Sequence, residues 1–264
     1  PAPKTVPYPP AVLSTNAKYQ KSTPQQNAQA IAVAEARGKL VAEGMKVKLT
    51  TLKTPHFIIF TNWDAREYQF LKENCENAYT AVSRQFDIPT SENVFVGLLP
   101  VFMFNTKEEF IQYASDFDKF DVPKTWAGYY TGSSDGSGHM VMWKPDTKKR
   151  GVEQAELNWA HTLTHEFTHA LVHSFVPNLG SMGKDDYGSH AESGGLNEGW
   201  ADYFSSSFAG NPTVGDYAGQ GLGGAEIGLR NNDNDKKCPD DMIGEVHADS
   251  EHWAGALWSI REHI

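Results

Sequence analysis

The sequence has little cysteine, no excess of positive charge and no long apolar run. Cys75 and Cys238 are its only cysteines, and no Cys-x-x-Cys pair occurs, which excludes zinc sites made of thiolates. The 23 Lys and Arg residues are outnumbered by 33 Asp and Glu, and the net charge of -10 argues against nucleic-acid or anionic-membrane partners. The longest apolar stretches, 57–60 and 94–104, are too short or too interrupted to span a bilayer. We therefore expect neither nucleic-acid binding nor membrane insertion.

The chain begins at Pro1 without an initiator Met, a charged n-region or an apolar h-region, so no signal peptide is visible. Together with 7 Trp and 10 Tyr, the missing Met favours a processed protein that is secreted or held in the periplasm or cell envelope. In an oxidising compartment Cys75 and Cys238 could form one disulfide, and otherwise they would remain two buried thiols. The sequence does not choose between these states, and it gives no indication of the oligomeric state.

Composition and periodicity predict a single α+β domain in this chain of 264 residues. Residues 1–27 carry Pro, Ser, Thr, Asn and Gln without periodicity and indicate an extended or disordered arm. Residues 28–151 predict an α/β lobe and residues 152–264 a mainly helical lobe of the same domain. The last helical pattern stops at Ile264 without a capping signal, which favours a further segment at the C-terminal end.

Strand and helix patterns alternate through the first lobe. Helices are expected at 28–43, from a cap at Asn62 or Asp64 to Phe86, and at 105–117; strands are expected at 47–52, 55–61, 94–104, 127–130 and 139–143. The last two strands should form a hairpin, and Pro100 marks its own strand as an edge or bulge. In the second lobe, helices are expected from Val152 to about Pro177, from Leu196 or Asn197 to Phe208, and near the C-terminal end, with a long loop at 209–246.

The segment His165-Glu166-Phe167-Thr168-His169 places two imidazoles four residues apart, with a carboxylate beside the first. On a helix, positions i and i+4 share a face, so both rings can bind one divalent cation. Glu166 is then placed to take a proton from a water molecule that the metal activates. A catalytic zinc has three protein ligands and one open position, so a third donor is required. The best candidate is Glu198, and Asp202 on the same helix face can accept the free N–H of a ligand imidazole.

These residues resemble the gluzincins, zinc peptidases in which a second helix after the His-Glu-x-x-His helix supplies a glutamate ligand. The segment Asn197-Glu198-Gly199-Trp200-Ala201-Asp202 is similar to the Asn-Glu-x-x-Ser-Asp segment of the thermolysin group, with Ala201 in place of the serine. Over residues 56–208 the resemblance implies a zincin-like fold, with a mixed sheet in the N-terminal lobe and the active-site helix between the lobes. It implies one zinc ion bound by His165, His169 and Glu198, with Glu166 as the base and Asp202 as support.

The segment 245–258 resembles the part of fungalysin- and thermolysin-like enzymes that brings a histidine to the site. The resemblance implies that His247 donates to the oxyanion of the tetrahedral intermediate. Three tyrosines are alternative donors, although each could equally be a packed aromatic side chain: Tyr203, Tyr129 and Tyr130.

Other zinc classes fit less well. A metzincin would need Gly at 172 and His at 175, where this chain has Val172 and Phe175. An aspzincin would use Asp185 or Asp186, but Lys184 occupies the place of its ligand. His161 and His173 lie one turn before and after the motif and are expected to be hydrogen-bonded or surface residues. Calcium binding by the run 231–235 lacks a specific motif, so we expect a solvated acidic loop there.

The sequence therefore predicts a zinc-dependent peptidase that acts on a peptide or protein substrate. An extended substrate could align on a strand edge near Ala127–Tyr130 or His139–Trp143. The alternatives are a catalytically silent zinc-binding or scaffolding protein with a zincin fold, and a zinc hydrolase that acts on a non-peptide amide. Side-chain preference and the choice between endo- and exo-cleavage leave no signal in the sequence.

Overall fold

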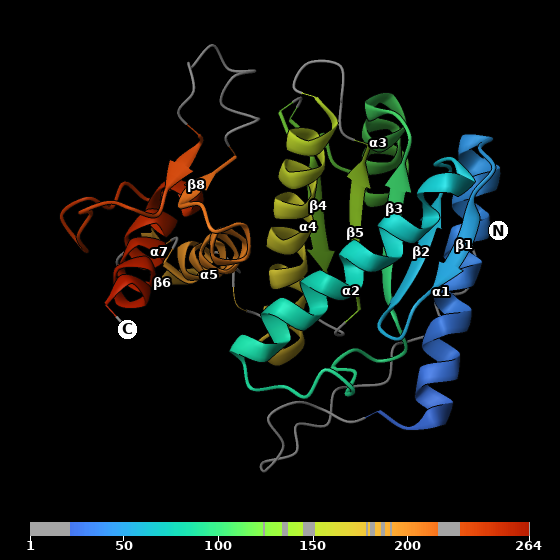
Figure 1. Cartoon of the computed structure of the whole chain (residues 1–264), viewed down its shortest axis with the longest axis horizontal. Helices are drawn as coiled ribbons and strands as arrows, with labels where there is room; N and C mark the ends of the chain where they lie inside the picture. Colours follow the sequence, from blue (N-terminus) through green and yellow to red (C-terminus); the bar gives the residue numbers. More distant parts are fainter. Residues whose placement is uncertain are drawn as a thin grey trace. The chain divides into compact units, whose positions relative to one another are not determined.

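The computed structural model describes residues 22–123, 125–133, 137–144, 151–177, 179, 183–185, 188–190, 192–215 and 228–263. The chain divides into two compact units, one made of residues 1–124 and 128–144, the other of residues 125–127 and 145–264 (Figure 1). The first unit combines helices with a five-stranded sheet and the second is mainly helical. The α+β class expected from the sequence is therefore confirmed. Residues 1–21 of the expected N-terminal arm lie outside the described residues.

The first unit is built on a mixed sheet with the strand order β1-β2-β3-β5-β4. Strand β2 pairs antiparallel with β1 and parallel with β3, which pairs parallel with β5, and β4 pairs antiparallel with β5. The expected hairpin of the last two strands is thereby confirmed. Because β5 is paired on both sides, the range 139–143 offers no free edge, and β4 is the edge strand at this end of the sheet. The strands are β1 (Thr50–Lys53), β2 (Phe57–Thr61), β3 (Leu99–Phe104), β4 (Gly128–Gly132) and β5 (Gly138–Trp143).

Helices cover both faces of this sheet. The helices are α1 (Pro24–Met45), α2 (Tyr68–Gln85) and α3 (Lys107–Tyr113), with a 3-10 turn at Ala65–Glu67 and a π-helical turn at Ala114–Asp118. Phe60 and Phe102 pack with α1 and α3 in one buried cluster. Phe57, one residue before Ile58 and therefore on the opposite face, contacts Tyr79 of α2 edge to face. Figure 1 shows α2 crossing the sheet on the side opposite to α1 and α3.

Three sequence-based expectations about the first unit are wrong in detail. Helix α1 begins at Pro24 rather than residue 28, because Thr23 caps it and forms a capping box with Gln26. The strand expected at 94–104 begins only at Leu99, and it lies inside the sheet rather than at an edge. Pro100 is tolerated there because the pairing of β3 with β5 starts one residue later, at Val101.

In its described residues, the second unit shows three long helices and two short antiparallel ribbons. The helices are α4 (Val152–Phe175), α5 (Glu192–Ala209) and α7 (Val246–Glu262), and the ribbons pair β6 (Gly183–Asp185) with β7 (Gly188–His190) and β8 (Thr213–Val214) with β9 (Arg230–Asn231). Helix α5 begins four residues before the expected Leu196 and packs against both α4 and α7. The loop expected at 209–246 contains β8 and β9, while residues 216–227 lie outside the described residues.

Glycine allows α5 and α7 to approach closely. A Cβ atom at Gly199 would lie 2.8 Å from Cβ of Trp253 and 3.1 Å from the carbonyl oxygen of Ser250. The helix spacing therefore depends on the absence of a side chain at this position, next to Glu198. This explains why a Gly-containing segment is helical here although an isolated helix would be weakened by it.

Both cysteines carry free thiols: Cys75 is buried in α2 and Cys238 is exposed. In the part of the chain that the structure describes, none of the helices has the length and apolar character needed to cross a bilayer.

A buried carboxylate fastens the first unit together. Asp118 Oδ1 accepts a hydrogen bond from Arg37 Nη2 at 2.6 Å, and Oδ2 accepts from the hydroxyl of Tyr129 at 2.6 Å and from His139 Nε2 at 2.9 Å. Burial alone raises the pKa of Asp118, but His139, Tyr129 and Arg37 together lower it below its ordinary value. The carboxylate thus joins α1, the π-helical turn, β4 and β5.

We predict that Asp118→Asn lowers the free energy of unfolding by about 3 kcal/mol at pH 7, because the amide removes the charge beside Arg37 and offers fewer acceptors to the imidazole and phenol. A lowered pKa means that the carboxylate contributes fully above its unfolded value, about pH 4, and loses that contribution as the pH falls further. The difference between variant and wild type should therefore shrink in urea titrations taken from pH 7 to pH 3. Asp116→Asn, on the exposed side of the same turn, is the control. A difference that stays constant with pH would contradict the role of the charge.

Candidate metal centre

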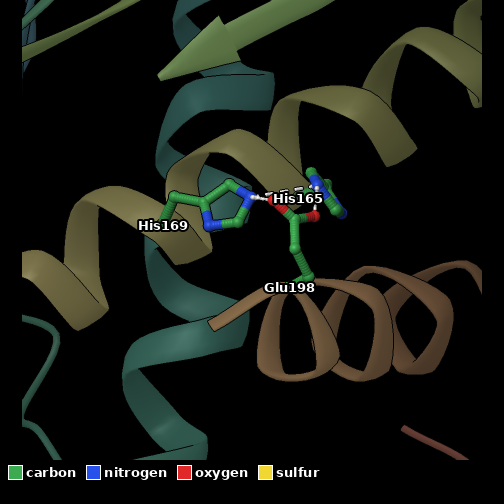
Figure 2. Close-up of side chains that lie close together, drawn as sticks. All are labelled: His165, His169 and Glu198. Atoms are coloured by element: carbon green, nitrogen blue, oxygen red, sulfur yellow. Dashed lines mark hydrogen bonds and ion pairs between the residues drawn. The ribbon is translucent and has the colours of Figure 1, made fainter. Parts of the chain in front are cut away.

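Three side chains of the second unit converge on one point (Figure 2). His165 and His169 project from adjacent turns of α4, and Glu198 projects from α5, which packs against it. We call these three residues the ligand triad. Their nearest ring nitrogen and carboxylate atoms all lie within 4.8 Å of one another, and among the described residues they are the only group of His, Cys, Asp or Glu with this property.

The spacing within the ligand triad fits a shared cation better than a set of hydrogen bonds. The two Nε2 atoms are 3.1 Å apart, and they lie 3.5 Å and 3.6 Å from the nearer oxygens of Glu198. Donor atoms bound to one tetrahedral zinc at about 2.0–2.1 Å are roughly 3.3 Å from each other. Oε2 of Glu198 is buried, and among the described residues it has no hydrogen-bond partner, only charged neighbours in His165 at 3.5 Å and Arg230 at 3.9 Å. Since a buried carboxylate oxygen is costly to leave unmatched, the donor set suits a metal ion.

Both imidazoles are oriented by an acceptor behind them. Nδ1 of His165 faces Asp202 Oδ1 at 3.2 Å, and Nδ1 of His169 faces Asn197 Oδ1 at 3.3 Å. An acceptor near Nδ1 favours a ring proton at that nitrogen, which leaves Nε2 of each ring as the atom that a metal ion could use. Asp202 thus occupies the place expected from the sequence. The contact of Asn197 with His169 was not expected, because the sequence indicated Asn197 only as the first residue of the segment that carries Glu198.

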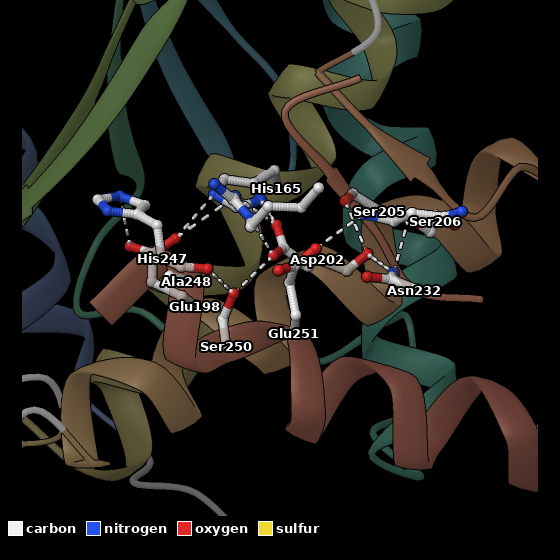
Figure 3. A network of polar contacts seen from close by, with 12 residues as sticks. His165, Glu198, Asp202, Ser205, Ser206, Asn232, His247, Ala248, Ser250 and Glu251 are labelled. Atoms are coloured by element: carbon white, nitrogen blue, oxygen red, sulfur yellow. Dashed lines mark hydrogen bonds and ion pairs between the residues drawn. The ribbon is translucent and has the colours of Figure 1, made fainter. Parts of the chain in front are cut away.

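The second unit surrounds the carboxylate of Asp202 with donors (Figure 3). Arg230 of β9 donates from Nε to Oδ2 at 2.6 Å and from Nη2 to Oδ1 at 2.7 Å, and the Ser250 hydroxyl lies 3.1 Å from Oδ2. Asp202 is completely buried. Burial alone raises the pKa of Asp202, but Arg230 and His165 lower it far below its usual range. Asp202 is therefore a permanent anion behind the ring of His165.

The electrostatics of the triad favour a positive charge at its centre. Burial alone lowers the pKa of His165, but the carboxylates of Asp202 and Glu198 outweigh it and raise the pKa to about 10. Burial alone raises the pKa of Glu198, yet His169 and His165 lower it to about 2. Protonated His165 and Arg230 together balance the charges of Glu198 and Asp202.

The two residues expected to act on the substrate lie on α4 and α7. Glu166 follows His165 directly, is 9% exposed, and its charge contributes to the raised pKa of that imidazole. His247 lies in the first turn of α7, with Nε2 3.6 Å from Glu198 Oε1 and Nδ1 2.8 Å from Glu245 Oε1. Its side chain is 42% exposed, so it faces solvent as well as the triad.

The remaining candidates from the sequence occupy other places. His161 is buried, and its Nε2 lies 2.9 Å from the hydroxyl of Ser205, which agrees with a hydrogen-bonded packing role. The hydroxyl of Tyr129 is bonded to Asp118 inside the first unit. Tyr203 packs its ring against Phe204 on α5, His173 is half-buried near the end of α4, and Tyr130 lies on β4 of the first unit. The side chains of Asp185 and Asp186 lie outside the described residues.

We expected a solvated acidic loop at 231–235, but part of this run is buried and hydrogen-bonded. Asn232 is completely buried and donates from Nδ2 to the Asp202 carbonyl oxygen and to Ser206 Oγ. Asn234 donates to the carbonyl oxygens of Asn231 and Glu251, and its amide fills the space left by Gly255 of α7. Asp233 and Asp235 do face solvent. The run therefore anchors β9, and with it Arg230, to α5 and α7.

Arg230 is the residue that sequence reasoning missed. It lies 28 residues after Asp202, in a stretch without helix or strand periodicity. An arginine in such a stretch gives no local signal for a buried ion pair.

Comparisons with protein-family models, curated proteins and solved structures find no match for this chain. The candidate metal centre is therefore interpreted from its own residues and geometry.

We predict that Arg230→Met lowers the free energy of unfolding by about 3–5 kcal/mol, because the charge of Asp202 is then left buried without its main partner. Methionine keeps the length and apolar stem of the side chain, so lost packing contributes little. Urea denaturation of the metal-free protein measures the change. The matched control is Arg66→Met, which removes an exposed arginine from its contact with Asp64 and should leave stability unchanged. An equal effect of the two substitutions would contradict the importance of the buried pair.

Proposed function

We propose that this chain is a zinc-dependent peptidase of gluzincin type. The observation that carries the proposal is the convergence of two imidazole Nε2 atoms and one carboxylate at 3.1–3.6 Å from one another. Two imidazoles with one carboxylate form the donor set of several catalytic zinc sites. The exposed fractions of the three side chains, 14%, 11% and 16%, leave part of the centre accessible to solvent.

Residues His165, His169 and Glu198 would hold the metal ion. When bound, zinc supplies a Lewis acid that polarises a carbonyl and makes a water molecule more acidic at neutral pH. Asp202 and Asn197 keep the two imidazoles in the tautomer that binds it. Imidazole and carboxylate donors also suit other first-row metals, so the choice of zinc is part of the proposal.

Glu166 acts as the general base. Its carboxylate accepts a proton from water as the water oxygen bonds to the carbonyl carbon, and it returns that proton to the amine when the C–N bond breaks. Its position directly after His165, on the same buried helix, keeps it beside the triad. Removing this carboxylate should therefore affect the reaction without removing a metal ligand.

His247 stabilises the oxyanion. Glu245 accepts from Nδ1 of this ring, and in the doubly protonated ring Nε2–H is free to donate to the carbonyl oxygen as it becomes negative. Nε2 lies 3.6 Å from Glu198 Oε1, so the ring stands beside the ligand triad.

We predict that Glu166→Gln lowers kcat/KM for peptide cleavage by about 10²–10⁴-fold, because the amide cannot accept the proton. Bound zinc, measured by elemental analysis, should stay at one ion per chain. Glu153→Gln, at an exposed position on the same helix, is the control and should cleave like the wild type. A wild-type protein that binds zinc but cleaves no member of a peptide library would instead indicate a scaffolding protein or a hydrolase of non-peptide amides.

We predict that His247→Gln lowers kcat by about 10²–10³-fold while KM changes little, because the oxyanion is present only during the reaction. Steady-state kinetics on a peptide identified from the library measure both constants. His263→Gln removes an exposed imidazole at the other end of α7 and serves as the control. Unchanged kcat in His247→Gln would remove this residue from the proposed mechanism.

A further inference from the structure

Ser250 lies between two parts of the candidate metal centre (Figure 3). It is completely buried in α7. Its Oγ is 3.1 Å from Oδ2 of Asp202 and 2.6 Å from the carbonyl oxygen of His247. One neighbour is thus the carboxylate behind His165, and the other belongs to the backbone of the residue proposed to bind the oxyanion.

Both neighbours of the Ser250 hydroxyl are acceptors, and neither has a proton to give. The single O–H proton of serine must therefore be shared between them or alternate from one to the other. In either state the hydroxyl keeps two negative oxygens from facing each other directly. Without it, the carboxylate of Asp202 would lose one of its donors, and the first turn of α7 would lose one of its polar contacts with α5.

The close packing of α5 and α7 places Ser250 over Asp202. Gly199 lies three residues before Asp202, so the two share a face of α5. The carbonyl oxygen of Ser250 lies where a Cβ atom at residue 199 would approach it to 3.1 Å. The register of the two helices is therefore fixed at the level of Ser250. A hydroxyl one turn away could not reach Asp202.

We propose that Ser250 is a positioning residue that couples Asp202, and through it His165, to the turn of α7 that carries His247. The inference rests on the proposed function, and it adds that metal affinity and turnover are linked through one buried hydroxyl. The bidentate pair of Arg230 with Asp202 does not depend on Ser250, so loss of the hydroxyl leaves the main charge balance of Asp202 in place.

The test compares Ser250→Ala with Ser205→Ala in the full chain. Ser205 is also completely buried and also bonds to Asp202, but to its backbone carbonyl oxygen, at 3.1 Å, rather than to its carboxylate. Both variants remove a hydroxyl at equal burial, and only that of Ser250 touches the carboxylate. Ser205→Ala also removes the contact with Nε2 of His161, which is not a member of the ligand triad. Ser250→Thr keeps a hydroxyl at the position and serves as the rescue.

We predict that Ser250→Ala weakens zinc binding by about 3–10-fold in competition with a chelator, less than the loss of a group that contacts the ligand itself. We predict that it lowers kcat by about 10-fold with KM nearly unchanged. Amide exchange of Glu251 should become faster. Its N–H bonds to the His247 carbonyl in an α-helix, and this turn should open more often once the hydrogen bond from Ser250 to Asp202 is lost. Ser205→Ala should change neither zinc affinity nor this exchange rate, and Ser250→Thr should restore both.

The proposal is overturned if Ser250→Ala matches the wild type in zinc affinity and amide exchange, or if Ser205→Ala reproduces its losses. The melting temperature of each metal-free variant shows whether a loss is merely one of folding. A wild type that binds zinc without cleaving peptides would end the proposed function, while zinc affinity and amide exchange would still decide the role of Ser250. A wild type that binds no zinc would overturn both.

Discussion

The candidate metal centre depends on the contacts that the buried carboxylate of Asp202 makes with its donors. A charge without solvent is tolerated only when donors surround it, and here the donors come from three different elements. His165 lies on α4, Arg230 on β9 and Ser250 on α7, while Asp202 itself belongs to α5. Satisfying one anion therefore requires that all four elements take fixed positions. The orientation of a candidate metal ligand and the packing of the second unit are consequences of the same contact.

The ligand triad and its surroundings also explain why the centre should bind a cation. Glu198 and Asp202 stay ionised while buried, and the pKa of His165 rises to about 10 in response. A metal ion at this place must displace that proton, so binding should weaken as the pH falls. The exposed fractions of 11–16% keep the triad within reach of a ligand from solvent. The first unit has a separate buried anion, Asp118, whose described partners are one arginine, one tyrosine and one histidine.

Local signals in the sequence account for much of the fold. The hairpin of β4 and β5 and the long helix α4 follow from period-2 and period-3.6 patterns, which neighbouring residues set by themselves. The early start of α1 also has a local cause, the capping box formed by Thr23 and Gln26. The strand order has no such local signal. Pro100 suggests an edge strand, but the strands that pair with β3 depend on residues far away in the sequence. The role of Gly199 likewise depends on tertiary packing, because the missing side chain matters only where α7 lies against α5.

The sequence by itself determined that His165 and His169 lie on one face of α4, because residues four apart on a helix share a face whatever surrounds them. It also indicated Glu198 and Asp202 through their spacing on one helix. Only the tertiary structure decided which groups complete the centre: Arg230, Ser250 and the buried face of Asn232 lie 28–48 residues from Asp202 along the chain. No local sequence pattern predicts these partners of Asp202, because a carboxylate becomes buried and needs hydrogen-bond donors only when distant segments pack together.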